Sequence, residues 1–295
     1  MSPELLLAIS PGLVWSIINV AHKILAAKFI NNPKVMLIVY GVIMSLVSFG
    51  MAIFFSGFIW SSEWWLIVVA GIVNSFAVWI YLTAMQKYEP SRVIPLFAIG
   101  AVVIIISSAL ILGEVFDLIT YVGIGVILLG SVILSIKKTF FSAFSSKILW
   151  TMTLSGICFA FSAIVIKYLL STYSVTQVFS SVGIIEGPSA IIIALFFFKE
   201  IRLTIRQIKK RYLLYNALTE IVSISGSFLY TIAISVWYLS LVETLASLQF
   251  LFVFIWSLII SRFLPSLYAE ELNRRIIFQK LAAIALIIFG VYLIS

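Results

Sequence analysis

Long apolar runs divide this sequence, and each run is about as long as the hydrocarbon core of a bilayer is thick. A helix that crosses about 30 Å of hydrocarbon needs roughly 20 apolar residues. Turn signals such as residues 31–33 (NNP) and 89–91 (EPS) separate the runs. The pattern therefore predicts an all-α membrane protein with ten transmembrane helices. The predicted spans are residues 5–27, 35–59, 64–86, 93–112, 118–136, 148–170, 175–198, 212–237, 241–263 and 277–294.

Composition excludes several other classes of protein. The chain is 63% hydrophobic and 10% charged, whereas a soluble domain is roughly 45–50% apolar and about 25% charged. The net charge of +8 comes from residues in short loops and not from a basic stripe, so we expect no nucleic-acid binding. Cys158 is the single cysteine and His22 the single histidine, which argues against a disulfide, a metal site or any other cofactor.

Two connections between the predicted spans are longer than the others. Residues 199–211 (KEIRLTIRQIKKR) place isoleucines at helical spacing against Lys and Arg, which fits a helix in the headgroup layer or a solvated basic loop. Residues 264–275 are predicted to form a short exposed helix, because two glutamates precede two arginines by four residues.

The two halves of the chain resemble each other. Gly12 and Lys23 align with Gly156 and Lys167 at a shift of 144 residues, and further along Tyr81 aligns with Tyr230 at a shift of 149. Each half contains five predicted spans, an odd number, so the second half must enter the membrane from the opposite face. The sequence thus predicts two inverted five-helix repeats, residues 1–138 and 147–295, an architecture typical of secondary transporters.

Three segments of the first half also resemble a known family. These are WSIINVAHK (15–23), EPSRVIPLFAIGAVVIIISSALILGE (89–114) and YVGIGVILLGSVIL (121–134). They are similar to the EamA-type repeat of the drug/metabolite transporter superfamily. The second half departs from the pattern, because residues 262–263 (RF) stand where the first half has residues 113–114 (GE). The resemblance implies a ten-helix fold whose central cavity is lined by spans 1, 3, 4, 6, 8 and 9, with spans 5 and 10 packed outside.

Ionisable residues inside spans are costly, and each one is therefore a functional candidate. Glu186 lies at the middle of span seven, directly before Gly187 and Pro188, where the backbone is expected to kink or gate. Glu186 and Glu220 are candidates for coupling transport to protons. The alternative for Glu186 is a structural carboxyl group that ties helices together.

Lys23 and Lys167 occupy equivalent positions in the two repeats. They either extend to the interface or form a pair of cationic groups near the cavity mouths, suited to an anionic or zwitterionic substrate. His22 and Glu243 are expected to lie at the membrane interface, and a proton relay is the alternative role for His22. The other candidates for substrate binding are uncharged or aromatic residues of the cavity helices: Trp15, Asn19, Asn74, Trp79, Tyr230, Gln249 and Trp256.

These features predict a secondary transporter that moves a small metabolite by alternating access. The substrate would be an amino acid-like, drug-like or other amphipathic solute, with protons as a candidate coupling ion. A flippase for a lipid-linked substrate is the alternative. An enzyme is disfavoured because the chain offers no cluster of His, Asp or Cys. We expect an integral multi-pass protein of the plasma or inner membrane, either a monomer or a homodimer.

The distribution of basic residues predicts an orientation. Of 19 Lys and Arg, 17 lie in or beside the connections that follow spans one, three, five, seven and nine, and the other two are Lys23 and Lys167. Basic residues in short loops favour the cytoplasmic side. Both termini are therefore predicted to lie outside the cytoplasm, whereas the family resemblance implies termini inside.

Overall fold

The computed structural model describes residues 3–88, 93, 96–135, 146–263 and 274–294, and every regular element in that part of the chain is helical. Three helices, α1, α2 and α5, continue into π-helical turns over Leu25–Phe29, Ala52–Ser56 and Ser108–Leu112. The helices are α1 (Pro3–Ile24), α2 (Pro33–Met51), α3 (Trp64–Lys87), α5 (Phe97–Ser107), α6 (Leu118–Ser135), α8 (Ser146–Leu169), α9 (Val175–Leu195), α10 (Phe198–Ile205), α11 (Lys210–Val236), α12 (Leu239–Ala246), α13 (Gln249–Phe263) and α14 (Arg274–Ile294).

Most of these helices have the length and composition of membrane spans. Seven helical segments of the described chain are long and apolar enough to cross a bilayer, and three shorter apolar helices accompany them. Large apolar side chains face outward, as Phe54 and Leu110 do at 80% exposure each. A soluble protein rarely exposes so much apolar surface in continuous patches. The shorter helices are Phe97–Leu112, Leu118–Ile133 and Phe278–Ile294.

Four local predictions differ from the structure or fall outside it. Span nine is not one helix, because α12 ends at Ala246 and α13 begins at Gln249, with a tight turn between them in which the Leu248 N–H donates to the Leu245 carbonyl at 3.0 Å. Helix α9 runs through Pro188 without interruption. The basic connection forms a helix only over Phe198–Ile205. The helix predicted over 264–275 lies largely outside the described residues.

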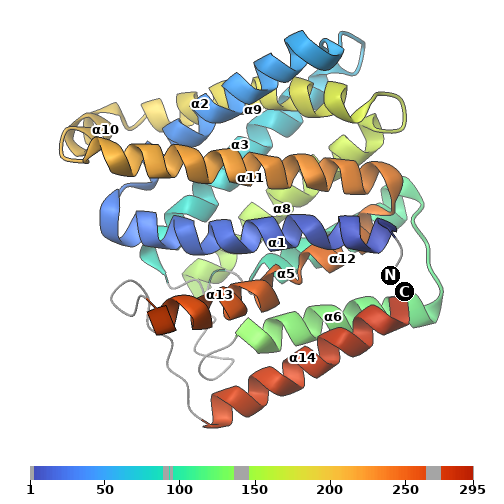
Figure 1. Cartoon of the computed structure of the whole chain (residues 1–295). Helices are drawn as coiled ribbons and strands as arrows, with labels where there is room; N and C mark the ends of the chain where they lie inside the picture. The colour runs from blue at the N-terminus through green and yellow to red at the C-terminus, as the bar shows by residue number, and fades with distance from the viewer. Residues whose placement is uncertain (1–2, 89–92, 94–95, 136–145, 264–273, 295) are drawn as a thin grey trace.

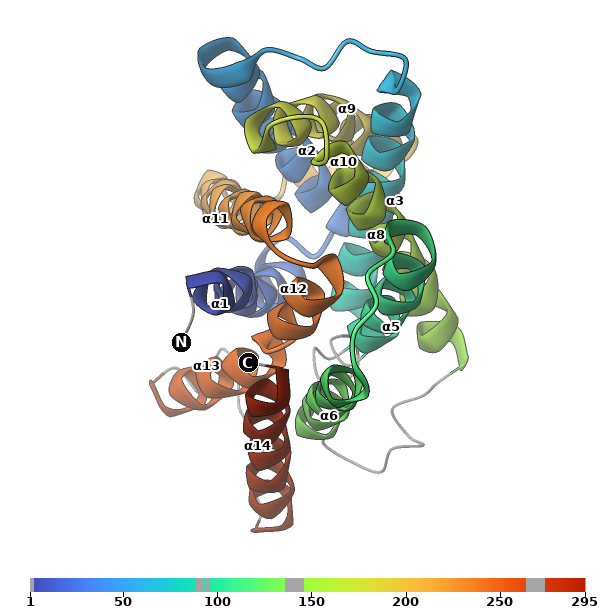
Figure 2. The ribbon, with the colours of Figure 1, turned by 90° about the vertical axis from the view of Figure 1, so that its right-hand side faces the viewer.

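Helices of one half pack mainly against helices of the other half. Helix α2 lies along α9, α6 along α14, α1 along α11 and α3 along α8 (Figures 1 and 2). Glycines allow the closest of these approaches. A methyl group on Gly41 of α2 would lie 2.6 Å from the carbonyl oxygen of Gly187 in α9, and one on Gly187 would lie 2.7 Å from that of Gly41. Small residues at such crossings are typical of helix packing in membranes.

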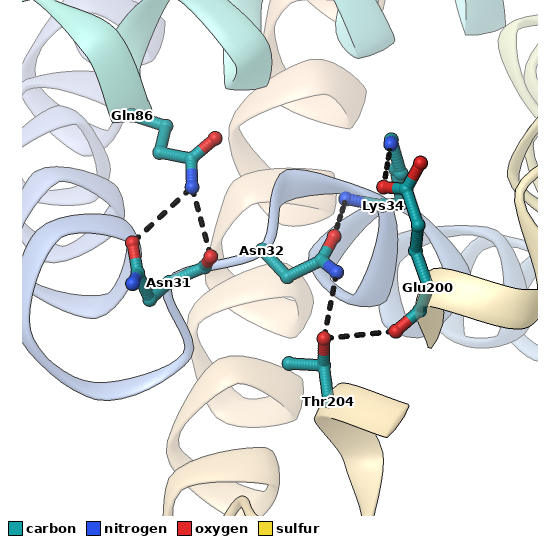
Figure 3. A network of polar contacts seen from close by, with 6 residues as sticks. All are labelled: Asn31, Asn32, Lys34, Gln86, Glu200 and Thr204. Atoms are coloured by element: carbon teal, nitrogen blue, oxygen red, sulfur yellow. Dashed lines mark hydrogen bonds and ion pairs between the residues drawn. The ribbon is translucent and has the colours of Figure 1, made fainter. Parts of the chain in front are cut away.

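The two ends of the bundle hold different features. Helix α1 starts and α14 ends side by side at one end, in both views (Figures 1 and 2). At the opposite end a polar network joins the α1–α2 turn to α3 and α10 (Figure 3). Asn32 caps α2 by accepting from the Lys34 N–H at 3.0 Å and donates to Thr204 Oγ1 at 3.0 Å, and Lys34 forms an ion pair with Glu200. This network lies beside the basic connection that follows α9.

Glu114 connects the two halves at the end that holds the termini. Gly113 adopts a left-handed conformation with φ of 70°, and the buried Glu114 follows it. Its carboxylate accepts from the N–H of Leu239 at 2.7 Å and of Ser240 at 2.9 Å, and from the Ser240 hydroxyl at 2.6 Å. A carboxylate at a helix N-terminus satisfies N–H groups that lack partners within the helix. The Gly-Glu pair of the first half thereby fixes the start of α12 in the second half.

Candidate functional site

A cavity of about 240 Å³ lies between the two halves of the bundle. Its wall includes residues from α1, α3, α5, α8, α11, α12 and α13, which correspond to predicted spans 1, 3, 4, 6, 8 and 9. Helices α2 and α9 also contribute, through Tyr40, Met44, Phe179, Val182 and Glu186. Their contribution was not predicted, since the family resemblance assigned no lining role to spans 2 and 7. Because α2 crosses α9 at small residues, their neighbouring side chains reach the cavity.

The structure brings most of the candidate residues together and separates the rest. Trp15, Asn19, Asn74, Glu186, Glu220, Tyr230 and Gln249 line the cavity. Trp79 and Trp256 lie outside its wall. The Trp256 indole donates to Ser16 Oγ at 3.1 Å and joins α13 to α1, whereas the Trp79 ring packs against Phe197 at 5.8 Å between centroids. These two tryptophans therefore hold helices together.

Glu186 is buried and held by side chains of two neighbouring helices. Its Oε1 atom accepts from the Tyr40 hydroxyl of α2 and from Asn74 Nδ2 of α3 at 2.5 Å. The Ser75 hydroxyl donates to the backbone carbonyl of Glu186 at 2.7 Å. These contacts support the structural interpretation of Glu186, because they tie α2, α3 and α9 together on one side of the cavity.

A second set of polar side chains forms a continuous chain of hydrogen bonds across the cavity. Asn19 Nδ2 donates to Gln249 Oε1 at 2.9 Å, and the Tyr81 hydroxyl donates to Asn19 Oδ1 at 2.7 Å. His22 lies 3.3 Å from that hydroxyl through Nδ1 and 3.0 Å from Glu220 Oε1 through Nε2. The chain links α13, α1, α3 and α11.

The interfacial placements predicted for His22 and Glu243 were wrong. His22 is buried at 5% exposure and lines the cavity, because α1 continues beyond it for another turn and its partners lie on other helices. Glu243 also lines the cavity, because α12 runs inward from the bundle end. Its carboxylate accepts from the Tyr230 hydroxyl at 2.9 Å, and the Tyr230 ring packs against Trp15 at 5.5 Å.

Neither Lys23 nor Lys167 is among the residues that line the cavity. Lys23 Nζ donates to the carbonyl oxygens of Met85 at 3.3 Å and Tyr88 at 2.9 Å, at the end of α3. Lys167 Nζ donates to the carbonyl oxygens of Ile234 at 2.6 Å and Trp237 at 2.9 Å, at the end of α11. The carbonyls at a helix C-terminus lack N–H partners within the helix, and a lysine ammonium group can donate hydrogen bonds to them.

Sequence reasoning missed Tyr40, Tyr81, His22 and Glu243 as cavity residues. Tyr81 was noted only as a repeat match, although an aromatic residue with a polar tip near the middle of a span needs a partner. The other three depend on which helices cross, and the sequence alone does not show that. Among the described residues, no group of three or more His, Cys, Asp or Glu is arranged to hold a metal.

The fold and the cavity define a multi-pass membrane protein with a chamber between two packed halves, and this chamber holds several buried polar groups. Residues 2–136 match the model of the EamA-like transporter family, a domain of the drug/metabolite transporter superfamily. The resemblance seen in the sequence is thus confirmed over the first half of the chain, which carries an EamA-type transporter domain. With its apolar helices, the protein is an integral multi-pass membrane protein.

Two further comparisons bear on the whole chain. A comparison with curated proteins gave no match. One solved structure, titled "Crystal structure of protein", is similar to this chain over 100% of its length and over 97% of the other chain, with a TM-score of 0.73 and 14% identity. At that identity the likeness concerns the fold alone. The solved structure nevertheless shows that the similarity in fold includes the second half of the chain, which the family match does not reach.

Proposed function

We propose that this protein is a secondary transporter that carries a small solute through the central cavity by alternating access. The observation that carries the proposal is a cavity with buried polar groups, enclosed between two halves that contribute corresponding helices. Polar groups are costly inside a membrane, and they concentrate where a solute passes or binds. The EamA domain of residues 2–136 belongs to a family of transporters and not of enzymes.

The cavity wall supports ten spans arranged as two inverted repeats, residues 1–138 and 147–295. Helix α1 aligns with α8 at the shift of 144 residues, and α3 with α11 at the shift of 149. Aligned residues line the cavity from both halves, in the same order along each helix. The aligned pairs are Trp15 and Phe159, Ile18 and Ser162, Asn19 and Ala163, His22 and Ile166, Asn74 and Ser223, Val78 and Ser227, Tyr81 and Tyr230, and Leu82 and Thr231.

The lysines follow the same correspondence. Lys23 and Lys167 differ by 144 residues, and their acceptors Met85 and Ile234, like Tyr88 and Trp237, differ by 149. A matched contact at each end of the cavity is what an inverted pair of repeats would produce.

Cysteine accessibility tests alternating access without knowledge of the substrate. The native Cys158 is first replaced by Ser, and Ser162→Cys then places a thiol on the cavity wall. In proteoliposomes we expect a membrane-impermeant thiol reagent to modify this residue from either side. The matched control is Ile192→Cys on the outer face of α9, where the side chain is 57% exposed and would face lipid, so that neither side should react.

Modification of Ser162→Cys from one side under every condition would contradict alternating access. The flippase alternative is tested in the same vesicles by following the transfer of a fluorescent lipid-linked sugar between leaflets. Lipid transfer together with one-sided thiol labelling would replace the transporter proposal with the flippase.

A further inference from the structure

The ionisable residues that line the cavity differ in kind from the basic residues that give the protein its net charge. The chain carries a net charge of +8, but the ionisable residues that line the cavity are Glu186, Glu220, Glu243, His22 and three tyrosines. Neither Lys nor Arg is among the lining residues that the structure describes. Lys23 and Lys167 directly follow lining residues in the sequence, but both donate to backbone carbonyls outside the cavity wall. Carboxyl groups are therefore the main charge-bearing groups on the wall.

The hydrogen-bond directions around His22 place one shared proton between His22 and Glu220. The Tyr81 hydroxyl donates its single hydrogen to Asn19, whose amide donates in turn to Gln249. With the amides oriented in this way, the contact between His22 Nδ1 and the Tyr81 oxygen requires an N–H on Nδ1. The 3.0 Å contact between His22 Nε2 and Glu220 Oε1 then requires one further proton, on either atom. With these bond directions the pair has no net charge.

The second oxygen of the same carboxyl group is available to a ligand. Glu220 Oε2 is buried and has no hydrogen-bond partner within the described part of the chain, and the residue is 1% exposed. A buried oxygen without a donor is costly, so the site favours a ligand that supplies an N–H group. Glu186 and Glu243, by contrast, each accept from a tyrosine hydroxyl.

Aromatic rings complete the wall around these carboxyl groups. Trp15 packs against Tyr230, and Phe97 packs against both Tyr81 and Phe159, with ring centroids 5.5 to 6.1 Å apart. The faces of such rings attract ammonium groups. At about 240 Å³ the cavity is smaller than the roughly 300–1,000 Å³ pockets that hold drug-sized ligands. A small molecule with one ammonium group and an apolar body matches this wall.

We infer that the cavity takes a small organic ammonium ion, bound at Glu220, in exchange for the proton held by His22 and Glu220. This inference rests on the proposed transport function and specifies its substrate class and coupling. One cation enters as one proton leaves, so the pair becomes a carboxylate beside a neutral imidazole and the exchange is electroneutral. The other titratable groups that line the cavity around the pair are Tyr40 on α2, Tyr81 on α3, Glu186 on α9, Tyr230 on α11 and Glu243 on α12.

Binding of three probes of similar shape tests the substrate class. The probes are 2-phenylethylammonium, the neutral 2-phenylethanol and the anion 3-phenylpropanoate, each titrated by calorimetry into purified wild-type protein. We expect the amine to bind at least about tenfold more tightly than the alcohol, a difference in dissociation constant that one charged contact supplies, and the anion not to bind. Equal binding of amine and alcohol, or tighter binding of the anion, would overturn the inference.

The dependence on pH tests the exchange. Because the amine and the proton compete, amine affinity should rise with pH, by up to about tenfold per pH unit while the pair is protonated. In weakly buffered solution each bound amine should release up to one proton. Glu220→Gln should weaken amine binding at least about tenfold and abolish the release, whereas Glu4→Gln, at an exposed residue of α1, should change neither.

A second variant guards against a failure of Glu220→Gln to fold. His22→Gln keeps the carboxylate and removes the imidazole, so the amine should still bind while proton release at pH 7 falls. Unchanged proton release in both variants would overturn the exchange. If Ser162→Cys is modified from both sides but the amine does not bind, the transporter proposal stands and this inference fails. If labelling is one-sided, the transporter proposal itself fails, whatever the amine does.

Discussion

The two halves of the cavity wall share a backbone arrangement but not a chemistry. On α1 the wall carries Asn19 and His22, and at the aligned positions of α8 it carries Ala163 and Ile166. Both pairs line the chamber, yet only the first pair belongs to the hydrogen-bond chain that ends at Glu220. If the two halves are the proposed repeats, they share the helix positions, whereas the polar groups of the hydrogen-bond chain lie on one side. Each prediction below tests either the shared arrangement or the divergent chemistry.

The largest effect is expected for orientation, which is all or none. In the first half the basic connections follow the first, third and fifth predicted spans, and in the second half they follow the second and fourth. Inverted repeats require this alternation if all basic connections lie on the cytoplasmic side. We predict that a reporter fused to the C-terminus and active only in the cytoplasm stays inactive. The control fusion ends after Lys209, in the basic connection, and should be active. The reverse result would show that the family orientation holds and that the charges do not set the topology.

Changes at the helix crossing shared by the halves should have the next largest effect. Gly41→Ala puts a methyl group 2.6 Å from the Gly187 carbonyl, so we expect thermal unfolding to show a loss of about 3 kcal/mol from overpacking. Gly50→Ala lies on the same helix with open space around it. That control should be neutral or slightly stabilising, because alanine favours a helix over glycine. Equal effects at the two glycines would show that α2 and α9 do not cross closely.

His22→Ile gives α1 the residue that α8 carries at the aligned position. The substitution leaves Glu220 Oε1 without its imidazole partner, and we expect a loss of about 2 kcal/mol in unfolding free energy. Ile166→Val on the other side of the cavity should cost about 1 kcal/mol, the usual cost of removing one buried methyl group. A cost at His22 below that at Ile166 would mean that the hydrogen-bond chain does not stabilise the wall.

The two lysines should give the smallest and most equal effects. Lys23→Met and Lys167→Met each remove two hydrogen bonds to carbonyls at a helix end. We expect each variant to lose about 1 kcal/mol, because both side chains are partly buried and their bonds are partly replaced by water. Melting temperatures of the two variants, measured beside wild type, test the symmetry. A several-fold difference between the two losses would break the correspondence between the halves.

The sequence predicted the helical membrane class and most helix positions, because these depend on the length and order of apolar runs. It paired Lys23 with Lys167 but did not predict that both donate to carbonyls at helix ends. It did not predict the break between Ala246 and Gln249, which rests on local turns within an apolar stretch. Nor did it predict the burial of His22 and Glu243. The distance of a residue from a helix end can be read from sequence, but the burial of these two depends on neighbouring helices that only the tertiary structure supplies.

The lysine contacts also join two groups of helices. Helix α1 packs with α11, α12 and α13, and α8 packs with α3 and α5, so the bundle contains two groups of helices around the cavity. Lys23 reaches from the first group to the end of α3, and Lys167 reaches from the second group to the end of α11, at the opposite end. Each lysine is thus a cross-brace between the groups. If the proposed alternating access separates these two groups, loss of one lysine contact should loosen that end, while the other contact still joins the groups.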